Sequence, residues 1–182
     1  MIPHQLSNTQ WEAGVQQLLD CLNPWLIAEW QTCLVAAVDE PFYQPANEST
    51  SLHQIQFAHG YFNSVLHELA HWCVAGPERR LLPDFGYWYA PDGRSSEQQR
   101  KFECVEVKPQ AIEWHFAKAC GRPFQVSVDN LSGQPTDPEP FQKAVLGQAR
   151  RYRQEGLPSR AAQVVTLMAF SFNTNPMLFR FE

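Results

Sequence analysis

The sequence is poor in several features that mark particular classes of protein. Its 182 residues hold five cysteines and no CxxC pair, so we expect buried thiols in a reducing compartment rather than a disulfide framework. No basic run exceeds two residues and the net charge is −5, which argues against nucleic-acid binding. No apolar run approaches the roughly 18 residues of a membrane span, and the first residues lack the pattern of a secretory signal. We therefore expect a cytoplasmic protein without a membrane partner.

The composition is that of one globular domain. Hydrophobic residues make up 44% of the chain and charged residues 18%, which suits a packed core. Periodicity and end signals predict several helices: one that ends near residue 22, and others over residues 60–75, 96–120, 141–154 and 160–172. Ser95 and Ser96, each with glutamine three residues later, mark the start of the helix over residues 96–120, which Pro109 should kink or split. Short strands are expected at residues 55–58 and 85–89, and residues 25–38 fit a helix that continues into a strand. Residues 41–50, with two prolines and several polar side chains, are expected to form a loop. We predict a single compact, helix-rich α+β domain over residues 1–182, with a small sheet.

One motif dominates the chain, His67-Glu68-x-x-His71. Residues four apart lie on one face of a helix, and two imidazoles so placed can bind one metal ion. The surrounding residues 60–75 carry apolar side chains at helical spacing, and a Gly-Pro pair then ends the helix. The motif therefore predicts a metal site with His67 and His71 as ligands.

Two histidines need a third ligand. A third histidine at the metzincin spacing is excluded, because the positions three and six after His71 are Val74 and Pro77. Another helix must then supply it, and the helix that starts near residue 96 offers Glu103, Glu106 and Glu113. Apolar residues on both sides of Glu106 indicate an inward-facing carboxylate, which is costly to bury unless it is paired or bound to metal. We predict Glu106 as the third ligand, with Glu103 as the alternative, and close packing of the two helices.

This ligand set fits more than one chemistry. With zinc, Glu68 would act as the general base of a metallopeptidase of the gluzincin type. With ferrous iron, two histidines and one carboxylate leave positions open for dioxygen and substrate, and Glu68 would orient a ligand or a proton path. A structural metal in a binding module is a third hypothesis, since Cys73 and Cys104 lie near the motif.

Three blocks of sequence carry a resemblance to a known family. FAHGYFNSVLHELAHWCVAG (57–76), LLPDFGYWYAPDGR (81–94) and FECVEVKPQAIEW (102–114) resemble the bacterial elongation factor P hydroxylases, and the likeness extends more loosely through GRPFQVSVDNL (121–131).

The resemblance implies hydroxylation of the β-lysylated lysine of elongation factor P, the protein substrate, at a non-haem metal. It implies that His67, His71 and Glu106 hold this metal, for which we expect Fe(II) with dioxygen as co-substrate. Neither the electron source nor an organic co-substrate is indicated.

A lysyl-lysine arm carries ammonium groups, so its pocket should offer carboxylates and aromatic faces. Asp84, Trp88, Tyr89 and Asp92 lie in one short segment and are the predicted substrate-binding residues. A core strand with charged ends explains the same segment equally well.

Overall fold

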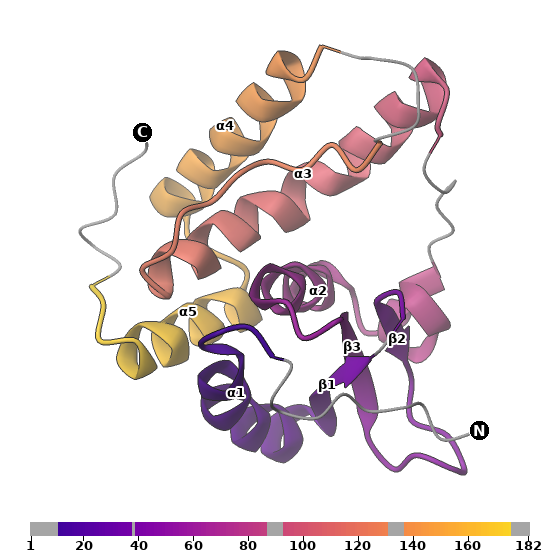
Figure 1. Ribbon diagram of the computed structural model, residues 1–182, viewed down its shortest axis with the longest axis vertical. Coiled ribbons are helices and arrows are strands. Elements are labelled where there is room, and N and C mark those ends of the chain that lie inside the picture. The colour runs from indigo at the N-terminus through magenta and orange to yellow at the C-terminus, as the bar shows by residue number, and fades with distance from the viewer. Residues whose placement is uncertain (1–10, 38, 87–92, 131–136, 176–182) are drawn as a thin grey trace.

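A small sheet lies at one side of the fold, and helices make up the rest of it (Figure 1). The computed structural model describes residues 11–37, 39–86, 93–130 and 137–175. Its helices are α1 (Val15–Trp30), α2 (Phe62–Val74), α3 (Ser96–Ala119), α4 (Glu139–Glu155) and α5 (Ser159–Ser171), and its strands are β1 (Thr32–Ala37), β2 (Phe42–Gln44) and β3 (His53–Ala58). Two short 3-10 helices, η2 (Arg79–Leu81) and η3 (Pro83–Gly86), follow α2. The predicted helix-rich α+β architecture with a small sheet is confirmed.

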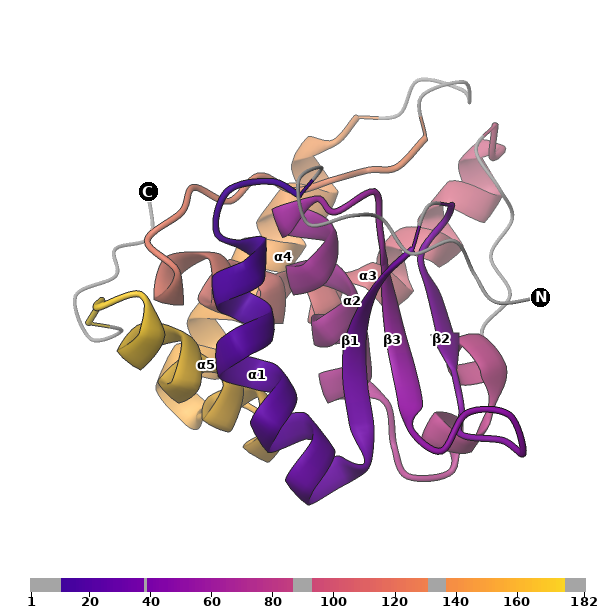
Figure 2. The same ribbon diagram turned by 60° about the horizontal axis from the view of Figure 1, so that its bottom comes forward.

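The three strands lie in the order β1-β3-β2, with β3 parallel to β1 and antiparallel to β2 (Figure 2). Helix α1 packs on β1 and α2 packs on β3. Buried residues of the sheet, such as Leu34 and Phe57, join the same core as Leu66 and Leu69 of α2. The sheet therefore supports the helix that carries the HExxH motif.

Helix α1 runs further than the sequence predicted. It continues through Pro24 to Trp30 before the chain enters β1, so the expectation that it ends near Leu22 was wrong. The apolar spacing of Leu18, Leu22 and Leu26 persists along the helix and keeps this face in the core. The helix-to-strand interpretation of residues 25–38 is confirmed.

Helix α3 begins with the predicted capping signal. Ser95 accepts a hydrogen bond from the backbone N–H of Gln98, and the Gln98 side chain accepts one from the backbone of Ser95. Pro109 neither splits nor ends the helix, which continues to Ala119. Helix α3 packs against α2, so the two helices that the metal prediction requires are in contact.

Two local predictions were wrong or untested. Strand β2 lies within residues 41–50, which we expected to form a loop. Phe85 belongs to a 3-10 helix with a backbone φ of 56° instead of starting a strand. The rest of that expected strand, residues 87–89, lies outside the described residues. Among the described helices, none is both long and apolar enough to cross a membrane.

Candidate metal centre

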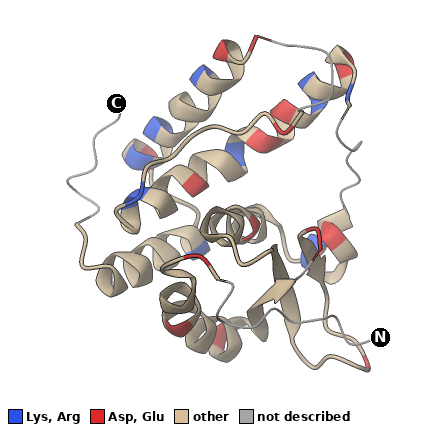
Figure 3. Ribbon diagram, viewed as in Figure 1, with Lys and Arg blue, Asp and Glu red and all other residues tan. Residues whose placement is uncertain are grey.

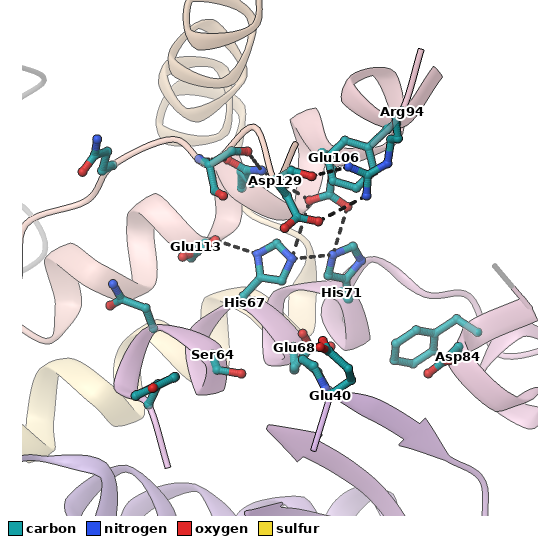
Figure 4. A pocket seen from close by; sticks show the side chains of 18 residues that line it. Glu40, Ser64, His67, Glu68, His71, Asp84, Arg94, Glu106, Glu113 and Asp129 are labelled. Atoms are coloured by element: carbon teal, nitrogen blue, oxygen red, sulfur yellow. Dashed lines mark hydrogen bonds and ion pairs between the residues drawn. The ribbon is translucent and has the colours of Figure 1, made fainter. Parts of the chain in front are cut away.

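Helices α2 and α3 bring three polar side chains together. The Nε2 atoms of His67 and His71 lie 3.0 Å apart. Glu106 of α3 places Oε1 3.2 Å from Nε2 of His71 and Oε2 3.6 Å from Nε2 of His67 (Figure 4). The two histidines share a face of α2 because they are one turn apart. Residues predicted from separate parts of the sequence thus meet at one point.

The spacing of these atoms suits a single metal ion. Two donors that bind one ion at about 2.1 Å, with bond angles of about 90–110°, lie about 3.0–3.4 Å apart. The three donors lie within 4.8 Å of one another, and their closest contacts are 3.0, 3.2 and 3.6 Å. Two imidazole nitrogens and a carboxylate are ligands that Fe(II) and Zn²⁺ both accept. The residues therefore fit the metal that the motif implies.

The electrostatics of the three side chains are complementary. Glu106 is 1% exposed. Burial opposes its ionisation, but His71 and His67 outweigh that effect and lower the pKa of Glu106 to about 2. Burial likewise opposes the charge on His67, but Glu113, Glu106 and Glu68 raise the pKa of His67 to about 10. The site thus holds a carboxylate that stays ionised and favours a positive charge next to it.

His67, His71 and Glu106 lie in the wall of a pocket with a volume of about 860 Å³. Glu68 and Asp84 line this pocket too. In the view of Figure 4, Glu68 lies on the opposite side of the histidines from Glu106. Asp84 comes from η3, and its Oδ1 accepts a hydrogen bond of 2.8 Å from the backbone N–H of Tyr43. Burial raises the pKa of both Glu68 and Asp84.

Carboxylates dominate the charge of the pocket. Six of them line it, namely Glu40, Glu68, Asp84, Glu106, Glu113 and Asp129. In Figure 3, acidic positions fall on α2, on α3 and next to β2. The single Arg or Lys among the described lining residues is Arg94, which forms an ion pair of 3.2 Å with Asp129. The pocket therefore suits a cationic ligand.

Comparisons with known proteins match this chain to one family. Residues 21–180 match the sequence profile described as elongation factor P hydroxylase. This chain belongs to the elongation factor P hydroxylase family. A relative from Haemophilus influenzae, the elongation factor P lysine hydroxylase, is 48% identical over 163 residues, which cover 90% of this chain and 92% of the relative. The family resemblance seen in the sequence is confirmed and extends well beyond residues 55–131.

The sequence offered Glu103, Glu106 and Glu113 as candidates for the third ligand. In the structure it is Glu106 that lies against the two histidines. Glu103 accepts a hydrogen bond from Gln99 at 3.1 Å and is not among the residues that line the pocket. Glu113 also reaches the site, with Oε2 2.9 Å from Nδ1 of His67. Its position seven residues after Glu106, two turns along one helix face, was a signal that sequence reasoning left unused.

The predicted substrate-binding residues are only partly described. Asp84 lines the pocket, whereas Trp88, Tyr89 and Asp92 lie outside the described residues. Another part of the pocket wall was not predicted from the sequence. Residues 122–130 form no helix or strand, and three of them, Gln125, Ser127 and Asp129, line the pocket.

Proposed function

We propose that this protein hydroxylates the β-lysylated lysine side chain of elongation factor P at a metal centre formed by His67, His71 and Glu106. Membership of the family and 48% identity to an elongation factor P lysine hydroxylase support the reaction and the partner. The observation that carries the proposal is the meeting of the three donors at one wall of a carboxylate-lined pocket. A translation factor as substrate agrees with the predicted cytoplasmic location.

The metal we propose is Fe(II). Two histidines and one carboxylate on one side of the ion leave positions open, and ferrous iron in such a set supplies activation of dioxygen. The protein's contribution is to hold the three donors. Glu106 is an ionised carboxylate, the form that binds a metal, whereas His67 must lose a proton before its Nε2 can bind. The buried face of α3 excludes water behind this carboxylate, which is 1% exposed.

The pocket residues orient the substrate. A lysyl-lysine arm carries ammonium groups. Among the described lining residues, Glu40, Glu68 and Asp84 are the pocket carboxylates that neither bind the proposed metal nor pair with His67 or Arg94. We assign Asp84 to binding an ammonium group, together with Trp88, Tyr89 and Asp92 of the same segment. Glu68 is the proposed catalytic residue, whose carboxylate faces the pocket and orients the arm or a proton path.

The metallopeptidase hypothesis makes a different demand on Glu68. A peptidase needs this carboxylate as general base, so Glu68→Gln would retain metal and lose all peptide cleavage. The family match favours hydroxylation. We therefore expect no Glu68-dependent cleavage of peptides by the wild-type protein loaded with Zn²⁺.

The test is the intact mass of lysylated elongation factor P before and after incubation with the Fe(II)-loaded protein, a reductant and air. We expect a gain of one oxygen atom with wild type, and none with His67→Ala, His71→Ala or Glu106→Ala. Glu103→Gln is the matched control, because it removes a carboxylate charge from the same helix outside the pocket. An unchanged mass with verified Fe(II) loading would overturn the proposal.

A further inference from the structure

His67 is held from both edges of its ring. Its Nε2 faces His71 and Glu106. Its other nitrogen, Nδ1, lies 2.9 Å from Oε2 of Glu113, which approaches from the opposite side (Figure 4). We propose that Glu113 is a positioning residue that fixes His67 in the tautomer and orientation needed to bind the metal. This inference rests on the metal centre of the proposed function.

The contact dictates the state of the imidazole. A carboxylate can only accept, so Nδ1 must carry the proton that it shares with Glu113. In a neutral ring the lone pair then belongs to Nε2, the nitrogen that faces the other donors. Carboxylates bonded to the far nitrogen of a metal-binding histidine orient the ring and raise its basicity. Glu113 therefore prepares His67 as a ligand without touching the ion.

Glu113 is badly placed to be a ligand itself. The imidazole ring of His67 stands between its carboxylate and the point where the three donors meet. The group of donors close enough to share an ion contains His67, His71 and Glu106. With its side chain only 12% exposed, the carboxylate also needs a compensating partner, and His67 is the one the structure gives it.

The arrangement is asymmetric, which makes it testable. Glu106 and Glu113 are two turns apart on α3, so one helix face supplies both the proposed ligand and the orienting group. Within the described part of the chain, no hydrogen bond to Nδ1 of His71 is found. Loss of Glu113 should therefore affect His67 and leave the orientation of His71 unchanged.

The experiment measures Co²⁺ binding to the metal-free full-length protein, followed by the visible absorption of the bound ion. We expect Glu113→Gln and Glu113→Ala to weaken binding about 10–100-fold. The isosteric Gln removes the charge while it keeps an acceptor, so its effect should be the smaller one. Glu103→Gln, the matched control on the same helix, should stay within about threefold of wild type.

Thermal unfolding of the metal-free proteins separates positioning from mere packing. A positioning role predicts that Glu113→Gln gains less stability from added Co²⁺ than wild type does, beyond any change in the midpoint of the metal-free protein. Wild-type affinity and spectrum in both Glu113 variants would overturn the inference while leaving the metal centre intact. If wild type itself bound no Co²⁺, or His71→Ala bound it as tightly, the proposed metal centre would fall, and the inference with it.

Discussion

Gln110 pairs with the backbone of Ser127 through both ends of its side-chain amide. Its Oε1 accepts from the N–H of Ser127 at 3.0 Å, and its Nε2 donates to the carbonyl oxygen of Ser127 at 2.8 Å. The same Nε2 lies 3.4 Å from Oε2 of Glu106. One amide, 1% exposed, thus joins a wall of the pocket to a proposed metal ligand.

Gln110→Ala should therefore loosen the pocket wall. The substitution removes two hydrogen bonds to Ser127 and leaves a cavity between α3 and the segment that contains Ser127. We therefore expect a loss of about 1–3 kcal/mol in the free energy of unfolding. Urea denaturation of the metal-free protein measures it. Gln142→Ala, at an exposed position of α4, is the control and should change stability by less than about 0.5 kcal/mol. Equal losses in the two variants would show that the amide contributes nothing specific.

Asp84→Asn tests the assignment of this carboxylate to an ammonium group. Asn keeps an oxygen for the N–H of Tyr43 and tolerates the φ of 46° at this position, so the change removes charge alone. We expect KM for lysylated elongation factor P to rise about 5–10-fold with little change in kcat, as for loss of about 1 kcal/mol of uniform binding. Glu48→Gln, an exposed carboxylate in the β2–β3 connection, is the matched control. An unchanged KM would refute the assignment.

Arg160 ties α5 to the end of the helix that carries the motif. Its guanidinium donates to the carbonyl oxygens of Trp72 and Cys73, each at 3.0 Å, and lies over the Trp72 ring at 4.7 Å. Arg160→Lys keeps the charge but loses the planar fork, and we expect it to destabilise the fold by about 1–3 kcal/mol. In the same denaturation assay Arg151→Lys, whose ion pair with Glu155 is exposed, should cost less than about 0.5 kcal/mol. Matching stabilities would contradict this role.

His115 should make the fold sensitive to acid. Burial lowers its pKa, Arg153 adds to that effect, and a hydrogen bond to the Ala149 carbonyl only partly offsets it. Because the folded pKa lies below the unfolded value of about 6.5, the unfolded chain binds the extra proton first as pH falls. Stability is thus fully present above pH 6.5 and falls below it, by up to about 1.4 kcal/mol per pH unit. Unfolding free energies measured between pH 7.5 and 5 should show a shallower fall in His115→Gln, and an identical slope would reject the prediction.

The sequence predicted the parts of the site that depend on local spacing. The helical period of residues 60–75 placed His67 and His71 on one face, and the Ser95 signal marked the start of α3. Glu106 was predicted because apolar neighbours indicated a buried carboxylate, a cost that implies a partner. Each of these inferences uses residues within a few turns of one another, where the geometry of a helix is known in advance.

The tertiary structure decided everything that depends on how separate segments meet. Helical spacing from Glu106 puts Glu103 and Glu113 near the same face of α3, one before it and one after it. Only the packing of α3 on α2 shows that Glu113 meets His67, whereas Glu103 pairs with Gln99 outside the pocket. The pocket wall at Ser127 is held by the Gln110 side chain, which makes the two backbone hydrogen bonds that a neighbouring strand would otherwise make. No periodic pattern in the sequence predicts such a contact. The sequence by itself determined the family, the helices and the proposed ligands. Packing between distant segments determined which carboxylates reach the proposed ligands, and it gave the pocket its negative charge. Such long-range contacts depend on the shape of the whole core rather than on local spacing.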